Sequence, residues 1–492
     1  MKKGAVRMER KKRKTGWLKW GLAAFAILFL VTMIYHQVKP LPEGVSRASE
    51  PVNISDDQID FLSDLTYQGE DTEVNEQEIF QDVERSIREA REYIVMDFFL
   101  FNPYSNEDRQ YPDITARLSS ALIEQMELYP DLNVVLITDE INTTYNGHAS
   151  DHLDVLKEAG AEIVYTNLDA LRDPNILYST LYRIGFQWFG DSQNGWLPNP
   201  MAKSAPDITI RSYLRLLNVK ANHRKVMVTE NDGFVLSANP HDASGYHSNV
   251  GVRLDGPILA DILEGEEAIA RFSKGDASRF PSEEKLSALR DEDSDGPMQV
   301  RYVTESKIQE AVVKAMDEAE AGETIWIGMF YLADRNIIQA IHDAAERGVF
   351  VKLILDPNTN AFGRDKSGLP NLPVTAELVE VNPEQIEVRW YEVGKEQYHP
   401  KMLYVEGEQR VVVIGSGNYT TRNMNDYNLE ADVEVTTATE TEFMREVDSY
   451  FKRLWNNEDG TYTVAYDEIQ TDLPIGKYLL YWLQKLTWTM TY

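Results

Sequence analysis

The chain has 492 residues, 43% of them hydrophobic, which predicts two folded domains with additional segments and excludes a disordered chain. None of the residues is cysteine, so disulfides, thiolate metal sites and cysteine nucleophiles are excluded. The formal net charge of −31 argues against nucleic acid as a partner, although a local basic pocket is compatible with an acidic surface.

The N-terminus has the opposite charge from the rest of the chain. Residues 1–38 contain nine Lys/Arg and one acidic residue, and an apolar run extends from Trp20 to Tyr35. Trp17 and Leu18 lengthen this run toward the ~20 residues that span a bilayer. We expect a single-pass anchor in the cell membrane, with a cytoplasmic N-terminus and the remainder outside. The alternative is a cleaved signal peptide, but no small-residue cleavage site directly follows the run.

Residues 39–75 are acidic and poor in apolar periodicity, which predicts a linker. Two halves with the same order of elements follow, residues 76–273 and 298–456. In the first we expect helices at 79–90, 118–126 and 152–157 and strands at 93–101, 132–140 and 161–167. In the second we expect helices at 308–316 and 337–345 and strands at 324–332, 349–357 and 385–392. This alternation predicts α/β halves with mostly parallel sheets covered by helices on both faces.

Two further segments lie outside these halves. Residues 274–297 are charged and contain Pro and Gly, which predicts a linker between the halves. Residues 457–492 form an aromatic C-terminal tail, which suits either a helix at the membrane interface or a terminal helix docked on the body.

Each half ends in the same short pattern. The stretch NHRKVMV contains His223 and Lys225, and YHPKMLYV, 176 residues later, contains His399 and Lys401. In each half a turn and a second strand with a Ser-x-Asn follow, which gives Ser237, Asn239, Ser416 and Asn418. Residues i and i+2 of a strand face the same side, so each unit is expected to bring an imidazole, an ammonium and an amide together.

The doubled unit indicates phosphodiester chemistry. Two histidines can divide the roles of nucleophile and general acid, while lysines and asparagines can bind the nonbridging oxygens of a phosphate. A single His-x-Lys pair is compatible with a solvated surface histidine, but equivalent pairs in two repeated halves are not explained in that way.

These units resemble the His-x-Lys-x4-Asp and Gly-Ser-x-Asn segments of the phospholipase D superfamily. The resemblance implies two duplicated α/β/α sandwich domains with the active site at their interface, and a metal-free reaction through a phosphohistidine, with no cofactor. It also implies catalytic roles for His223, Lys225, Asn239, His399, Lys401, Asn418 and Glu430, and substrate binding by Ser237, Ser416 and Asn249.

The chain departs from the family pattern at two kinds of position. Glu230 and Glu406 stand where the motif has Asp. Asn249 aligns with the position of Glu430, the carboxylate that orients a histidine in the second half. We therefore expect Asn249 to hold His223 as the neutral nucleophile and Glu430 to hold His399 as the general acid.

The expected substrate is a phospholipid, because an anchor and an acidic body favour lipid over nucleic acid. Cardiolipin-synthase-like phosphatidyl transfer and phospholipase D hydrolysis both fit, and an external nuclease or a noncatalytic binding protein are the alternatives. The insertion before His223 carries Tyr178, Tyr182, Phe186, Trp188, Phe189 and Trp196, which suit either a membrane-dipping lid or acyl groove, or packing between the halves. His148 and His152 have metal-like spacing, but we expect a solvated helix start there and no metal. The oligomeric state does not follow from the sequence.

Overall fold

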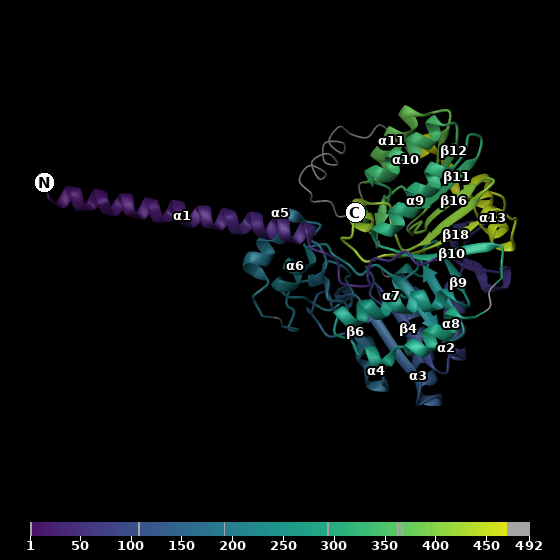
Figure 1. The fold of residues 1–492 in the computed structure, drawn as a ribbon, viewed down its shortest axis with the longest axis horizontal. Helices are drawn as coiled ribbons and strands as arrows, with labels where there is room; N and C mark the ends of the chain where they lie inside the picture. The colour runs from purple at the N-terminus through teal and green to yellow at the C-terminus, as the bar shows by residue number, and fades with distance from the viewer. Residues whose placement is uncertain are drawn as a thin grey trace.

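The computed structural model describes residues 2–106, 109–190, 192–292, 295–361, 364–365, 368–394 and 396–469. A long helix, α1 (Lys2–Val38), projects from a body that contains two sheets (Figure 1). Its segment Trp17–Val38 is long and apolar enough to cross a membrane, and none of its residues is fully buried. The most distal part of the predicted tail, from residue 470, lies outside the described residues.

The first half contains an eight-stranded sheet within the described residues, in the order β3-β2-β9-β8-β7-β4-β5-β6. Its strands are β2 (Ile59–Gln68), β3 (Glu73–Glu76), β4 (Tyr93–Phe98), β5 (Asn133–Thr138), β6 (Glu162–Tyr165), β7 (Lys225–Thr229), β8 (Gly233–Leu236) and β9 (Asn249–Leu254).

The second half contains a nine-stranded sheet in the same described part of the chain, in the order β1-β10-β18-β17-β16-β11-β12-β15-β19. Its strands are β1 (Val52–Ile54), β10 (Met298–Thr304), β11 (Thr324–Met329), β12 (Phe350–Leu355), β15 (Ile386–Tyr391), β16 (Lys401–Glu406), β17 (Arg410–Gly415), β18 (Ala431–Thr437) and β19 (Thr463–Ala465). A separate pair, β13 (Asn360–Ala361) and β14 (Arg364–Asp365), lies between β12 and β15 in sequence.

The two sheets repeat one topology. The order β9-β8-β7-β4-β5-β6 in the first matches β18-β17-β16-β11-β12-β15 in the second, which confirms the expected α/β fold in two like halves. The prediction of mostly parallel sheets is wrong, because only β4-β5-β6 and β11-β12-β15 pair in parallel. The hairpins that follow each histidine, β7-β8 and β16-β17, join these strands antiparallel and make both sheets mixed.

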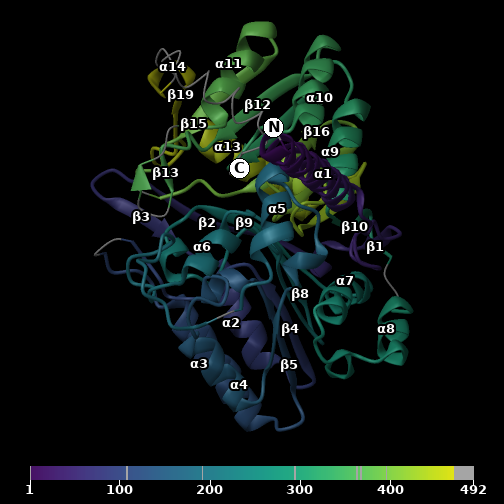
Figure 2. The same ribbon diagram turned by 90° about the vertical axis from the view of Figure 1, so that its left-hand side faces the viewer.

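Helices cover both faces of the sheets (Figures 1 and 2). The first sheet carries α2 (Ile79–Glu89), α3 (Ile114–Leu128) and α4 (Asp151–Ala159) on its outer core, and the second carries α9 (Ser306–Glu318), α10 (Arg335–Glu346) and α11 (Asn371–Val381). A third core contains buried residues of both sheets together with α7 (Ile258–Phe272) and α13 (Glu442–Asn456). The two halves therefore share one hydrophobic core.

Shorter helices complete the described chain. They are α5 (Ile176–Leu181), the π-helical η4 (Tyr182–Phe186), α6 (Ile210–Leu216), α8 (Glu283–Arg290), α12 (Thr421–Met424) and α14 (Tyr466–Ile469). Single 3-10 turns occur at η1 (Asp56–Gln58), η2 (Glu140–Thr143), η3 (Leu168–Ala170), η5 (Asp242–Ser244) and η6 (Ala277–Arg279).

The segment expected to be a loose linker, residues 39–75, is instead part of the body. β1 pairs with β10 of the second sheet, and β2 pairs with β9 of the first. The apolar residues Ile59, Leu62 and Leu65 of β2 are buried, so burial of this strand against the sheet fixes a segment whose composition is otherwise acidic. The other boundaries proposed from the sequence stay predictions.

Candidate active site

Each histidine of the two His-x-Lys units is placed by a hydrogen bond to the other half. The backbone N–H of His223 donates to the carbonyl of Leu429, and that of His399 donates to the carbonyl of Ser248, both at 2.8 Å. The lysine two residues later begins the following strand, where Lys225 pairs with Phe98 and Lys401 with Met329. The two units thus meet where the halves touch.

The side-chain partners of the histidines are crossed between the halves. His223 Nδ1 lies 3.0 Å from Glu430 Oε2, and His399 Nδ1 lies 3.1 Å from Asn249 Oδ1. The expected pairing of Asn249 with His223 and of Glu430 with His399 is therefore wrong. Alignment of the two halves identifies Asn249 and Glu430 as the orienting residues. Each of them contacts the histidine of the opposite half across the domain interface.

The serines of the two Ser-x-Asn segments hold these orienting residues. Ser416 Oγ donates to Glu430 Oε2 at 2.6 Å, and Ser237 Oγ donates to Asn249 Oδ1 at 3.2 Å. Both serines are fully buried, and in the described part of the chain neither lines the pocket between the histidines. Their hydroxyls thus contact Asn249 and Glu430, and the expected binding of substrate by these serines stays a prediction. Asn423 Nδ2 also donates to Glu430.

The two lysines lie behind the imidazoles. The ammonium groups of Lys225 and Lys401 donate to the carbonyls of His223 and His399, respectively. Each ammonium also lies over an aromatic ring, 5.5 Å from the centroid of Phe99 and 5.2 Å from that of Phe330. These rings in turn pack against the imidazoles, at 5.2 and 5.0 Å between centroids. The phenylalanines directly follow the equivalent strands β4 and β11, and they belong to neither motif that marks the site in the sequence.

A pocket of about 270 Å³ contains both imidazoles. Asn239 and Asn418 line it together with Asn249, as the sequence predicts for the two amides of the Ser-x-Asn segments. Asn418 is 5% exposed, and its Oδ1 has no partner among the described residues. An amide left without a partner in a polar pocket is available to a ligand.

Two cationic residues of this pocket were not predicted from the sequence. Lys220 and Arg422 line it from opposite halves. Burial lowers the pKa of Lys220 to about 8, although its 2.9 Å contact with Asp173 opposes the shift, and burial lowers the pKa of Arg422 to about 10. Both therefore carry charge at neutral pH. The acidic chain thus encloses a basic pocket suited to a phosphate.

Burial shifts the histidines toward their neutral forms. It lowers the pKa of His223 to about 4, while Glu430 opposes this shift. Burial also lowers the pKa of His399 well below its usual value, and the charge of Lys401 adds to the effect. Burial lowers the pKa of Lys225 to about 7 and that of Lys401 far from its usual range. An anion bound in the pocket favours the protonated forms of all four groups.

Glu430 itself is ionised. Burial raises the pKa of its carboxyl, but the neighbouring His223 and its hydrogen bond, followed by Lys225 and Ser416, outweigh burial and lower the pKa below its usual value. A charged, fully enclosed carboxylate on Nδ1 fixes the His223 tautomer that leaves Nε2 free.

A buried ionic network lies directly behind this pair. Arg224 is fully buried and contacts Glu266 at 3.0 Å and Glu305 at 2.7 Å. Glu305 Oε1 also accepts from the backbone N–H of Glu430 at 3.2 Å. Arg224 thus connects the first histidine's strand to the second half and supports the crossed contact.

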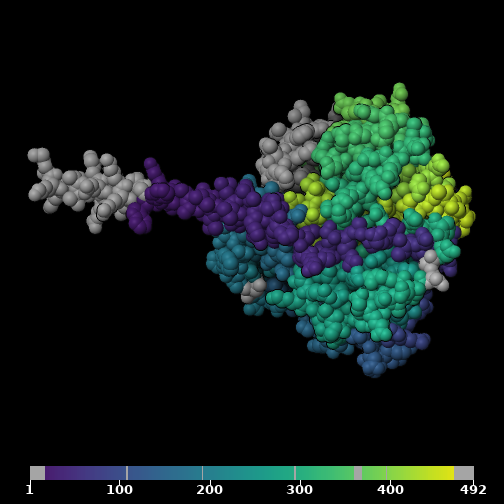
Figure 3. Space-filling view, viewed as in Figure 1, coloured from purple at the N-terminus to yellow at the C-terminus, as the bar shows by residue number. Residues whose placement is uncertain are grey.

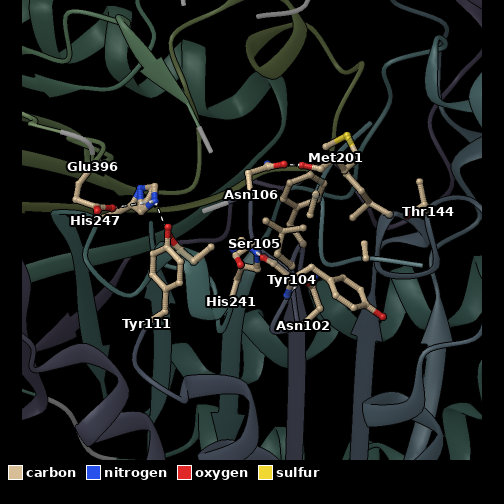
Figure 4. A pocket seen from close by; sticks show the side chains of 16 residues that line it. Asn102, Tyr104, Ser105, Asn106, Tyr111, Thr144, Met201, His241, His247 and Glu396 are labelled. Atoms are coloured by element: carbon tan, nitrogen blue, oxygen red, sulfur yellow. Dashed lines mark hydrogen bonds and ion pairs between the residues drawn. The ribbon is translucent and has the colours of Figure 1, made fainter. Parts of the chain in front are cut away.

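A second, mainly apolar cavity adjoins the pocket (Figure 4). The two share Phe99, Leu100, Ile141, Met201 and His247. The His247 ring packs edge-on against that of His399 at 6.2 Å between centroids. Tyr104, Tyr111 and Glu396 line its further walls. The shared residues therefore include neighbours of both imidazoles, Phe99 beside His223 and His247 beside His399.

The remaining sequence-selected residues have structural surroundings. Glu230 accepts from the backbone N–H groups of residues 91–93, and Glu406 accepts from Trp326 Nε1 at 2.9 Å. His148 is buried, not solvated as expected, and its ring lies 5.7 Å from that of Tyr104. No group of three or more metal-ligating side chains occurs among the described residues.

Comparisons with known proteins are consistent with this geometry. Residues 312–455 match the family described as cardiolipin synthase, phospholipase D-like domain. A search of curated proteins finds no match. The fold is similar to the crystal structure of phosphatidylserine synthase from Haemophilus influenzae Rd KW20, with a TM-score of 0.58 and 12% identity over 91% of this chain and 96% of that one. Polyphosphate kinase from Porphyromonas gingivalis gives a TM-score of 0.42 at 12% identity, over 93% of this chain and 56% of that one.

Proposed function

We propose that this chain, an enzyme of the phospholipase D superfamily, transfers phosphatidyl groups between alcohols at a membrane. Residues 312–455 match a phospholipase D-like domain, and the strand order and His-x-Lys unit of that domain recur in the first half. The observation that carries the proposal is a single basic pocket containing an imidazole from each half. Its cations can bind the phosphate of a phospholipid, and the adjoining apolar cavity can accept the part of the substrate next to it.

The reaction proceeds in two displacements. His223 Nε2 attacks phosphorus, the bond from phosphorus to the leaving oxygen breaks, and His399 donates a proton to that oxygen. His399 then takes a proton from an incoming alcohol, whose oxygen attacks phosphorus and breaks the bond to His223. Water in place of the alcohol makes the same cycle a hydrolysis. Each step balances without an oxidant or a metal.

The crossed contacts support His223 as the nucleophile and His399 as the general acid. The reason differs from the sequence-based one, which paired Asn249 with His223 and Glu430 with His399. Attack by Nε2 puts positive charge on the His223 ring, and the Glu430 carboxylate 3.0 Å from Nδ1 stabilises that charge. His399 has the neutral Asn249 as its partner and is therefore the weaker base, so it releases its proton more readily.

The membrane helix favours a lipid substrate. Trp17–Val38 joins the catalytic body to a bilayer, with the basic N-terminal residues on the cytoplasmic side and the pocket on the outer side. Phosphatidylglycerol is the proposed substrate, because one molecule can supply the phosphatidyl group and a second the accepting alcohol.

The test is mass spectrometry of the lipids formed when the full chain is incubated with phosphatidylglycerol vesicles. Cardiolipin and glycerol are expected from the wild type and from His342→Gln, since His342 lies on α10 and contacts Asn382 away from the pocket. Neither product is expected from His223→Ala or His399→Ala. Phosphatidic acid as the main product shows hydrolysis, and no lipid turnover overturns the proposal.

A further inference from the structure

The body end of α1 is hydrogen-bonded to the segment of chain that precedes His223. The carbonyl of His36 accepts from the backbone N–H of Asp173 at 3.2 Å, and Lys39 Nζ donates to the carbonyl of Asp169 at 2.9 Å. Arg172 donates to the carbonyl of Lys39 at 3.0 Å and also contacts Asp426 at 2.9 Å. The helix therefore ends in a defined position on the body, against the residues that directly precede α5 in the sequence.

Large apolar side chains are exposed beside this attachment. We call them the aromatic surface, which consists of Leu177, Leu181, Phe186, Trp188, Phe189 and Trp196. Trp188 is 75% exposed, and Phe189 and Trp196 are each 64% exposed. Figures 1 and 2 both show α5 next to the body end of α1, and Figure 3 shows the same region beside the helix on the molecular surface. The rings of Phe186 and Phe189 lie 6.5 Å apart. Six large apolar side chains exposed within 20 residues of chain are typical of an interaction surface.

The length of the helix places this patch at a bilayer surface. Trp17–Val38 has 22 residues, or about 33 Å at 1.5 Å per residue, which only just exceeds a hydrocarbon core of ~30 Å. The outer boundary of the core therefore falls near residues 36–38, where the helix meets the body. Trp is typical of the interfacial belt, and Phe and Leu beside it suit an apolar face that is buried at the membrane interface.

The same segment of chain builds part of the catalytic pocket. Met201 and Leu216, which lie in the insertion after the aromatic surface, line the pocket, as do Val219 and Lys220. Tyr427 OH donates to Gln37 Oε1 at 2.8 Å near the end of α1, three residues before Glu430. The insertion thus leads directly to His223, and the end of α1 also contacts the segment that carries Glu430, the partner of His223.

We propose that the aromatic surface inserts into the interfacial region of the bilayer that α1 crosses, and that this second contact holds the pocket toward the lipid headgroups. The occupant is the phospholipid bilayer. The proposal rests on α1 spanning a membrane, as the proposed function does, but it does not require that the chain be catalytically active.

The absence of cysteine makes a direct test possible. Trp188→Cys and Phe189→Cys each give a single labelling site for an environment-sensitive fluorophore in the full chain, reconstituted in phosphatidylglycerol vesicles. Leu128→Cys is the matched control, because Leu128 is 70% exposed and is the last residue of α3, a helix that Figure 1 shows at the edge of the body away from α1. Lipids with brominated acyl chains should quench the probes at 188 and 189 strongly and the probe at 128 weakly.

Equal quenching at all three sites overturns the proposal. The proposal is also overturned if the probe at position 188 is shielded from water but is not quenched by brominated lipid. In that case a second copy of the chain or another protein covers the aromatic surface.

A second measurement separates this surface from the chemistry. The combined change Trp188→Ser, Phe189→Ser and Trp196→Ser should lower turnover of vesicle lipid roughly tenfold, because interfacial binding scales with the apolar area inserted. Hydrolysis of a small water-soluble phosphodiester should stay unchanged. Loss of both activities indicates damage to the pocket and contradicts the proposal. Inactivity of the wild type on both substrates counts against the proposed function but leaves the quenching result valid.

Discussion

The imidazole of His223 in the first half is held by the carboxylate of Glu430 in the second, with 3.0 Å between Nδ1 and Oε2. The reciprocal contact, from His399 to Asn249, has an amide oxygen in place of a carboxylate. The two histidines are therefore chemically unequal although the halves share one topology. Neither half alone contains a histidine with its orienting partner.

Replacing Glu430 by Gln should separate orientation from charge. The amide can still accept from His223 Nδ1, but it cannot stabilise the positive ring formed by attack on phosphorus. We expect kcat to fall by about 10²-fold or more, with a small change in KM. Wild-type enzyme quenched with alkali and denaturant should carry the adduct on His223, because a bond from phosphorus to an imidazole nitrogen survives in alkali; peptide mass spectrometry under non-acidic conditions detects it. An adduct on His399 would instead identify His399 as the nucleophile and His223 as the general acid.

Asn249→Asp should move the pH profile. A carboxylate 3.1 Å from His399 Nδ1 favours the charged imidazole and raises the pKa of His399, which burial otherwise lowers. Activity that needs protonated His399 is lost as pH rises through this pKa, so the alkaline limb of kcat/KM should shift upward by about 1–3 units. The profile is measured with a soluble phosphodiester. A downward shift or an unchanged limb contradicts the role of His399 as the proton donor.

Ser416→Ala tests whether the hydroxyl positions Glu430 or binds substrate. Ser416 Oγ donates to Glu430 at 2.6 Å and accepts from the backbone N–H of Ala431 at 3.0 Å. We expect kcat to fall roughly tenfold with KM nearly unchanged, as for one lost hydrogen bond to a charged group. Ser416→Thr, which keeps the hydroxyl, serves as the conservative comparison. An effect confined to KM supports direct contact with substrate instead.

Activity should survive in a chelator such as EDTA. The proposed displacement uses imidazoles, lysines and amides in place of a Lewis acid. The measurement is lipid turnover before and after dialysis against the chelator, with full retention expected. Complete loss that added divalent metal restores contradicts the metal-free reaction.

Asp64 should make stability depend on pH. Its carboxylate accepts from the backbone N–H groups of Glu78 and Ile79, and burial raises its pKa from 3.8 to about 7. A raised folded-state pKa stabilises the fold fully below about pH 4, and this contribution is lost as pH rises through about 7.

Asp64→Asn removes this titration while keeping an acceptor. The difference in unfolding free energy between pH 4 and 8 should be smaller than in the wild type by at most about 4 kcal/mol. Denaturant unfolding at both pH values measures it, with the exposed Asp131→Asn as the control. An identical pH dependence in wild type and Asp64→Asn contradicts the assignment.

The sequence by itself determined the duplicated α/β organisation, the two hairpins and the residues of both His-x-Lys units. Local patterns carry this information, because strand and helix periodicity and the i, i+2 spacing depend on residues close in the chain. The long apolar helix at the N-terminus follows from composition for the same reason.

Only the tertiary structure decided which residues meet across the interface. The partner of His223 lies 207 positions away, and no local periodicity distinguishes it from the aligned Asn249. Arg422 and the ring of Phe99 likewise reach the pocket from segments far from His223 in the sequence. The pairing of β2 with β9 likewise overrode an acidic composition, because burial of its apolar face depends on a strand nearly 200 residues away in the sequence. Contacts between distant segments are set by packing of the two sheets, and that packing is a property of the whole chain.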